Sequence, residues 1–403
     1  MSASSLTPKP HYEILDGLRG VAAVLVVAFH ILEVHAQGHV DLLLNHAYLA
    51  VDFFFLLSGF VIGYAYDDRW GSMSPGGFFK RRLIRLQPLV VMGAILGAAL
   101  FFFQRSDFWP MVAVAPAWKV MLVMLVGCTM LPLLPAFDIR GGAEMYPLNG
   151  PAWSLFYEYV ANILYALFVR RFSTTLLAVL VVLSGGVLVH LAVTGPACDV
   201  IGGWSLELVQ IRYGLTRVVY PFFAGLLLFR IGKPARVEHG FLLSSLLLVV
   251  LLVMPRLGEY AHLWMNGIYE SVTIVVLFPL VVFIGASSQL SGKLSTTLCR
   301  FLGEISYPIY ITHFPLVELY RAWVFNHKLT LRESYPLALL VFALAIVLAY
   351  ACLKLYDEPA RRWLRRRFSG EAAPKPQGPL GAGSSLVESC LPQPDAFGAD
   401  VEQ

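Results

Sequence analysis

An arginine and a histidine stand out in the first apolar segment of the chain, residues 14–32 (ILDGLRGVAAVLVVAFHIL). Charged groups are costly inside a membrane-spanning helix, and those found there are usually functional. Arg19 and His30 are eleven residues apart. At 100° per residue, this spacing places them within about 20° of each other on one helix face and about 16 Å apart along the helix axis. We therefore expect a cation near one membrane surface and a titratable imidazole deeper in the membrane, both facing the same way.

Two further apolar segments carry carboxylates. In the segment 46–66, Asp52 shares a narrow helical stripe with Gly59 and Gly63. This stripe indicates close approach of another helix or of a ligand, and we interpret the glycines as helix packing. In the segment 152–169, Glu158 lies on a polar stripe with Ser154. Each carboxylate is either part of a buried structural network or a group that binds a proton or a substrate hydroxyl.

A late segment, FLGEISYPIYITHFPLVELY, carries a second histidine within the apolar region. Ser306, Tyr310 and His313 share one helix face, and Pro308 and Pro315 are expected to kink the helix. A single buried histidine is more often a core hydrogen-bonding residue than a catalyst. Two histidines on polar stripes of separate helices favour function.

Basic side chains cluster in FFKRRLIRLQP, where Arg82 and Arg85 are predicted to lie close to the membrane surface. Such a cluster usually sets topology or binds lipid headgroups. It also suits an anionic ligand from the cytoplasm, because a guanidinium binds phosphate through two parallel hydrogen bonds. The pattern alone does not decide between these interpretations.

Metal chemistry is not expected. His30, His313, Asp52 and Glu158 could gather round a cation, but no local spacing such as HExxH supports a site. The five cysteines show no CxxC spacing either, so neither a zinc site nor a disulfide framework is indicated.

The elements that hold these residues are predicted to be membrane helices. Of the 403 residues, 58% are hydrophobic and 14% charged, with a mean hydropathy of +0.68. A soluble domain is about half apolar and about a quarter charged, so the composition excludes soluble multi-domain proteins and indicates a polytopic membrane protein.

The sequence contains eleven apolar runs. Basic clusters in the loops of a membrane protein usually lie on the cytoplasmic side, and all of them lie on one side here if a single run between 104 and 152 does not cross the membrane. The best candidate is 118–134, which is short and ends near Pro132 and Pro135. We therefore predict an all-α polytopic membrane protein with about ten transmembrane helices, one re-entrant or interfacial segment, and both termini in the cytoplasm. The predicted divisions are a cytoplasmic N-terminal segment 1–13, a transmembrane domain 14–367 and a disordered cytoplasmic tail 368–403.

Taken in order, these motifs resemble those of the membrane-bound acyltransferase-3 family. The resemblance runs from Leu15 to about Leu364. It is carried by LDGLRGVAAVLVVAFH with Arg19 and His30, VDFFFLLSGFVIG with Asp52 and Ser58, FFKRRLIRLQP with Arg82 and Arg85, AWSLFYEYVANILY with Trp153 and Glu158, LGEISYPIYITHFPL with Tyr310 and His313, and YDEPARRWL. One departure is the run Tyr157–Glu158–Tyr159, where the family often has a second carboxylate beside the first, so that Glu158 would act without that neighbour.

The resemblance implies transfer of an acyl group, most often acetyl, from acyl-CoA to a hydroxyl of a carbohydrate, a lipid-linked glycan or another small acceptor. Arg19, Arg82 and Arg85 would bind the phosphates of the CoA. His30 would be the general base or a transient acyl carrier, with His313 and Glu158 as further catalytic residues. Substrate contacts would come from Asp52, Ser58, Trp153 and Tyr310.

Membrane lipid is then the surrounding partner, no nucleic acid is expected, and the expected location is the bacterial inner membrane. Two other functions stay open. A proton-coupled transporter or flippase of a glycan or metabolite would use the same buried groups as a proton relay without consuming a thioester. A non-catalytic member of the family would not depend on Arg19 or His30.

Overall fold

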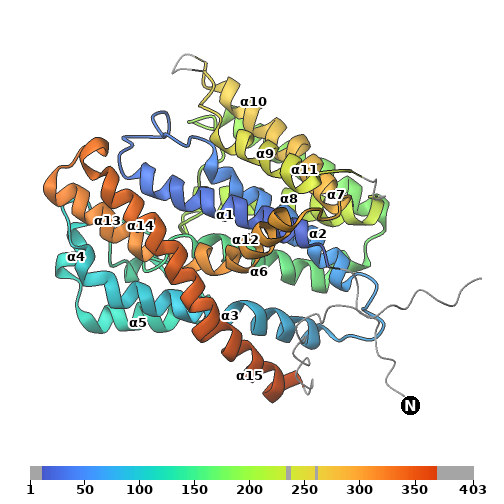
Figure 1. Ribbon diagram of the computed structural model, residues 1–403, viewed down its shortest axis with the longest axis horizontal. Helices are drawn as coiled ribbons and strands as arrows, with labels where there is room; N and C mark the ends of the chain where they lie inside the picture. The colour runs from blue at the N-terminus through green and yellow to red at the C-terminus, as the bar shows by residue number, and fades with distance from the viewer. Residues whose placement is uncertain (1–10, 233–236, 259–261, 370–403) are drawn as a thin grey trace, which may run out of the picture.

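The computed structural model describes residues 11–232, 237–258 and 262–369, and within these ranges the chain forms helices and loops with no named strand (Figure 1). The α-helices are α1 (Glu13–Glu33), α2 (Ala50–Tyr66), α3 (Pro75–Leu100), α4 (Pro110–Val114), α5 (Ala117–Gly127), α6 (Ala152–Leu167), α7 (Thr174–Thr194), α8 (Leu208–Ile231), α9 (Gly240–Val253), α10 (Trp264–Val272), α11 (Phe278–Ala286), α12 (Lys293–Thr312), α13 (Phe314–His327), α14 (Leu331–Cys352) and α15 (Glu358–Ser369). Two π-helical turns, Thr273–Leu277 and Leu353–Asp357, join α10 to α11 and α14 to α15.

Seven helical segments of the described residues are long and apolar enough to cross a membrane. They are Glu13–Glu33, Ala47–Tyr66, Pro75–Gln104, Thr174–Thr194, Leu208–Ile231, Trp264–Ala286 and Leu331–Phe368. The protein is therefore a multi-pass, all-helical membrane protein. The predicted number of about ten spans is not confirmed, because several apolar runs form helices that are short, such as α5 and α9, or interrupted.

The segment predicted to be re-entrant or interfacial, 118–134, contains one short helix. This helix, α5, has 11 residues, which corresponds to about 16 Å, whereas the hydrocarbon core of a bilayer is about 30 Å thick. Its placement relative to the membrane stays a prediction. Most of the predicted tail, from residue 370 onward, lies outside the described residues, while residues 368 and 369 end α15.

The glycine stripe of α2 forms a tight helix–helix contact. A Cβ at Gly59 would lie 1.8 Å from the carbonyl oxygen of Phe222 in α8, and a Cβ at Gly225 would lie 2.0 Å from that of Leu56. A second tight contact joins α1 to α12, which pack along each other (Figure 1). A Cβ at Gly20 would lie 2.2 Å from the Leu302 carbonyl oxygen. Small residues thus let the backbones approach closely in both seams.

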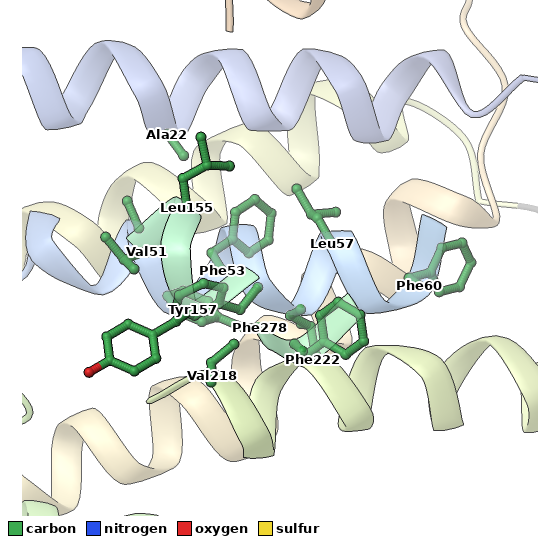
Figure 2. Close-up of a cluster of buried hydrophobic side chains, with 14 of the residues drawn as sticks. Ala22, Val51, Phe53, Leu57, Phe60, Leu155, Tyr157, Val218, Phe222 and Phe278 are labelled. Carbon is green, nitrogen blue, oxygen red and sulfur yellow. The ribbon is translucent and has the colours of Figure 1, made fainter. Parts of the chain in front are cut away.

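Aromatic side chains of α2 fill the space between these helices. Figure 2 shows Phe53 and Phe60 of α2 with Phe222 of α8 and Phe278 of α11. Phe53, Phe222 and Phe278 are fully buried. This apolar core fixes α2 against α8 and α11, so that the polar residues of α2 have a defined position.

The late apolar segment, 300–322, is interrupted at its histidine instead of forming one kinked helix. Helix α12 ends at Thr312, His313 lies at the junction, and α13 begins at Phe314. The break follows from Pro315, which has no N–H to bond the carbonyl group of Ile311 one turn earlier. That carbonyl oxygen accepts a hydrogen bond of 2.9 Å from Nδ2 of Asn149 instead.

Candidate functional site

The three predicted cofactor-binding arginines line one cavity. This arginine cavity encloses about 740 Å³ of empty space, part of it open to solvent. Its polar lining comes from α1, α2, α3, α6 and α12: Arg19, Ser58, Arg82, Arg85, Ser154, Glu158, Ser306, Tyr307 and Tyr310. The sequence motifs of five helices therefore converge on one space.

Two of these arginines are already paired with carboxylates. Nη2 of Arg19 lies 2.6 Å from Oδ1 of Asp16, one turn earlier in α1. Arg82 donates to Oε1 of Glu158, which also accepts a hydrogen bond of 2.6 Å from Oγ of Ser58. No ion-pair partner is found for Arg85 among residues 11–232, 237–258 and 262–369, so its charge is available to an anion in the cavity.

His30 lines a second cavity of about 1260 Å³, also partly open to solvent. Acids and guanidinium groups face this histidine cavity together with a wall of aromatic rings. Its lining includes Phe29, His30, Glu33, Tyr48, Phe108, Trp109, Glu144, Trp153, Trp204, Arg217, Tyr310, Phe314, Glu318 and Arg321.

The arginine cavity and the histidine cavity meet at two shared lining residues, Val51 and Tyr310. Along α1 the order is Arg19 in the first cavity and His30 in the second, about 16 Å further along the axis. Along α2 it is reversed, with Tyr48 in the histidine cavity and Ser58 in the arginine cavity. The two cavities therefore follow one another along α1 and α2.

The imidazole of His30 is held by a carboxylate. Its Nδ1 lies 2.8 Å from Oε2 of Glu33, one turn later in α1. Because an ionised carboxylate can only accept, Nδ1 carries the proton and Nε2 of a neutral His30 keeps its lone pair. Glu33 is not among the residues predicted from the sequence. Its position three residues after His30, on the same helix face, could have indicated this contact.

His313 stacks on His30, with ring centroids 5.5 Å apart and an angle of 27° between the planes. It is fully buried. Its Nδ1 donates to the carbonyl oxygen of Ile309 over 2.8 Å, and its Nε2 has no hydrogen-bond partner in the described structure. Since a carbonyl oxygen only accepts, Nε2 of neutral His313 is an acceptor without a donor.

Tyr310 lies where the two cavities meet. Its hydroxyl is 2.7 Å from Oγ of Ser154 and 3.3 Å from the carbonyl oxygen of Pro151. Because Ser154 also donates to the Pro151 carbonyl oxygen over 3.0 Å, the tyrosine hydroxyl is oriented by α6. Its position makes Tyr310 a hydrogen-bonding group that can reach a ligand in either cavity.

Asp52 lines neither cavity. It is fully buried and forms a two-point ion pair with Arg217 of α8, at 2.6 Å and 3.2 Å. The guanidinium of Arg217 also lies over the ring of Trp153, 5.3 Å from its centroid. The structure therefore puts Arg217 and Trp153, rather than Asp52, on the wall of the histidine cavity.

A second ion-pair network, largely buried, extends from Glu33. Arg321 lies 3.9 Å from Glu33 and 3.0 Å from Glu318, and Glu318 lies 3.0 Å from Arg140. Trp109 also donates to Glu318 over 2.7 Å. Sequence reasoning missed this network because its members come from α13 and from a loop, outside the polar stripes that helical spacing reveals.

Of the predicted site residues, Arg19, Ser58, Arg82, Arg85, Glu158 and Tyr310 thus share the arginine cavity, and His30, Trp153 and Tyr310 share the histidine cavity. His313 lies against His30, and Asp52 stands apart from both cavities. In the described part of the chain, no group of three or more His, Cys, Asp or Glu side chains is arranged to hold a metal ion.

Residues 12–354 match the family model described as an acyltransferase domain. The chain is 34% identical over 169 residues to protein 2 in the picA locus of Rhizobium radiobacter, covering 40% of this chain and 84% of that protein. It is 23% identical over 361 residues to the O-acetyltransferase OatA of Staphylococcus aureus, covering 86% of this chain and 57% of OatA. A putative O-acetyltransferase of the same species is 20% identical over 365 residues, with the same coverage.

This chain therefore spans somewhat more than half the length of these staphylococcal relatives. No solved structure matches it. The family model covers most of the chain. The protein belongs to the acyltransferase-3 family of membrane-bound acyltransferases, enzymes that transfer groups other than aminoacyl groups.

Proposed function

We propose that the protein moves an acyl group, in the first place acetyl, from acyl-CoA to a hydroxyl of a carbohydrate or other small acceptor. The observation that carries this proposal is the junction at Val51 and Tyr310 of a cavity lined by three arginines with a cavity that contains a carboxylate-bound histidine. A donor and an acceptor bound in separate cavities would meet there.

The arginine cavity fits the anionic part of acyl-CoA. Arg19, Arg82 and Arg85 offer planar donors to phosphate oxygens, which guanidinium groups bind through paired hydrogen bonds. Arg85 is the first contact in this proposal because it has no carboxylate partner in the described structure. The thioester would then extend from the arginines towards Tyr310.

His30 would act as the general base. Its Nε2 accepts the proton of the acceptor hydroxyl while that oxygen attacks the thioester carbonyl carbon. When the tetrahedral adduct collapses, the C–S bond breaks and the protonated His30 returns the proton to the departing sulfur, so that CoA leaves as the thiol. Glu33 would hold the imidazole in the productive tautomer and stabilise its protonated form, as an aspartate does in serine hydrolases.

The neighbouring groups divide the remaining tasks. The Tyr310 hydroxyl would turn its proton from Pro151 to the developing oxyanion, while its oxygen accepts from Ser154. His313, which is fully buried and stacks on His30, would position the imidazole of the base rather than stabilise the oxyanion. Glu158, together with Ser58, would hold Arg82 in place, and Asp52 would act through Arg217.

The acceptor is proposed to be a carbohydrate because of the walls of the histidine cavity. Trp109, Trp153 and Trp204 face it, and the C–H faces of sugar rings pack well on such rings. Two relatives are named O-acetyltransferases, which supports acetyl as the transferred group. The basic clusters support a bacterial inner-membrane protein with both termini in the cytoplasm.

The test is acetyl-CoA turnover by the purified full chain, wild type and His30→Ala, with release of CoA and acetylation of added carbohydrates measured together. Loss of a general base lowers the rate by about 10²–10⁴-fold. His190→Ala is the matched control, since His190 is exposed on α7 and lines neither cavity. A folded His30→Ala variant with wild-type transfer would refute the catalytic assignment. Carbohydrate movement across a vesicle membrane without loss of acetyl-CoA would favour a transporter instead.

A further inference from the structure

Glu144 is a charged residue on the wall of the histidine cavity that the proposed reaction does not use. It lies in the loop between α5 and α6, which pairs with a second loop through a bridge between Glu144 and Ser205. Its Oε2 atom is buried and has no hydrogen-bond partner in the described structure. A buried carboxylate oxygen without a donor is costly, so a donor from a ligand in the cavity would be stabilising.

The charges around Glu144 do not neutralise it directly. Arg321 is paired with Glu318, which is also paired with Arg140, and Arg217 is paired with Asp52. No cation lies within 4.0 Å of Glu144 among the described residues, although Arg140, Arg321, Glu318 and Asp138 all act on it through space. The guanidinium groups facing the cavity already have carboxylate partners, and Oε2 of Glu144 can therefore accept a hydrogen bond from a ligand.

Glu144 also lies close to an aromatic ring of the cavity wall. A Cβ at Gly142 would be 3.2 Å from the ring of Trp109 and 3.5 Å from Cγ of Glu144, so these two side chains are neighbours. The residue after Glu144, Met145, donates its backbone N–H to the carbonyl oxygen of Trp204 over 2.8 Å, and Trp204 lines the same cavity. A sugar ring that packs on Trp109 would present its edge hydroxyls to the carboxylate.

We propose that Glu144 binds a hydroxyl group of the acceptor and selects an uncharged, polyhydroxylated ring over an anionic one. This inference rests on the proposed function, since it assigns the acceptor to the histidine cavity. A hydroxyl donates to the orphaned oxygen, while a uronate or a phosphorylated sugar would place a second negative charge beside Glu144 and Glu318.

The pKa of the Glu144 carboxyl group determines how binding of the acceptor should depend on pH. Burial, which is opposed by Arg140 and reinforced by Glu318, raises the pKa of Glu144 to about 7. The group therefore changes charge near neutral pH. An ionised carboxylate accepts a stronger hydrogen bond from a hydroxyl, so acceptor binding should improve as pH rises through this value.

The experiment compares wild type and Glu144→Gln, as purified full chains, with acetyl-CoA and three probes: methyl β-glucopyranoside, glucosamine and glucuronate. A hydrogen bond to a charged group contributes about 1.5–3 kcal/mol, so the KM for the neutral glucoside should rise by about 10-fold or more in Glu144→Gln. Discrimination against glucuronate should fall in the same variant. Glu207→Gln, an exposed acid at the start of α8 that lines neither cavity, is the matched control.

Three results would overturn the inference: unchanged KM values in Glu144→Gln, glucuronate as the best wild-type probe, or no acetylation of any of the three. Glu144→Asp keeps the charge but shortens its reach, so it should give an intermediate KM. Affinity for acetyl-CoA, measured separately, distinguishes the two proposals. If acetyl-CoA neither binds nor reacts, the proposed function fails; if it binds and reacts through His30 while Glu144→Gln behaves like wild type, only this inference fails.

Discussion

Replacement of Gly59 by alanine should loosen the seam between α2 and α8. The added Cβ would lie 1.8 Å from the Phe222 carbonyl oxygen, about 1.6 Å short of the 3.4 Å at which ordinary contact begins. The obstacle is backbone, so relief requires one helix to move. Overpacking of this kind costs about 1–3 kcal/mol, and a rigid backbone neighbour favours the upper end. The same movement would strain the pair between Asp52 and Arg217, which bridges the same two helices.

The assay is the apparent unfolding temperature of the purified protein in one detergent and at one heating rate, because membrane proteins often unfold irreversibly. Gly186→Ala in α7 is the matched control, since a Cβ there would have nothing within 4 Å. Alanine is favoured over glycine in a helix by about 1 kcal/mol, so the control should be unchanged or more stable. If Gly59→Ala unfolded at the same temperature as Gly186→Ala, this would contradict the close backbone contact between α2 and α8 at Gly59.

Three further outcomes follow from the ion pairs and the buried acid. Asp52→Ala leaves Arg217 charged and buried, and should destabilise the protein by about 3–5 kcal/mol, seen as a lower unfolding temperature; equal stability to wild type would contradict the buried pair. Arg85→Ala should weaken acetyl-CoA binding by about 10-fold or more in a ligand-binding assay, whereas the exposed Arg171→Ala should not. The pKa of Glu144 is raised from 4.5 to about 7, so its contribution to stability is fully present below pH 4.5 and is lost as pH rises through 7. Between pH 5 and pH 8 the apparent unfolding temperature of wild type should therefore fall further than that of Glu144→Gln. Equal decreases in the two proteins would argue against a raised pKa at Glu144.

Composition and helical spacing predicted the helical membrane class and the polar faces of single helices, because these are local properties. The resemblance to the family, not the spacing, grouped Arg19, Arg82 and Arg85, which line one cavity. Arg19 and His30 line separate cavities along α1, and Glu158 lines the same cavity as Ser58. The number of spans was harder to predict, since hydropathy alone does not separate a spanning helix from a short helix such as α5. The break at His313 could be located only approximately from Pro308 and Pro315.

The partners of the polar residues could not be predicted in the same way. Arg217 meets Asp52 from a distant helix, and Glu144 meets Trp109 through loop conformation, neither of which leaves a periodic signal. Glu33 is the exception, because one turn after His30 is a position that helical geometry makes available for contact. A search for acids at this spacing from each buried histidine would have found it.

Donor and acceptor are proposed to meet where the two cavities join, at Val51 and Tyr310. The most direct measurement is the rate of acetyl transfer by Val51→Phe, a larger side chain at that junction, alongside its affinity for acetyl-CoA. We expect affinity near that of wild type, because the arginines are untouched, and a transfer rate lower by about 100-fold, the effect of misplacing reacting groups by about 1 Å. Wild-type transfer by a folded Val51→Phe enzyme would contradict the account.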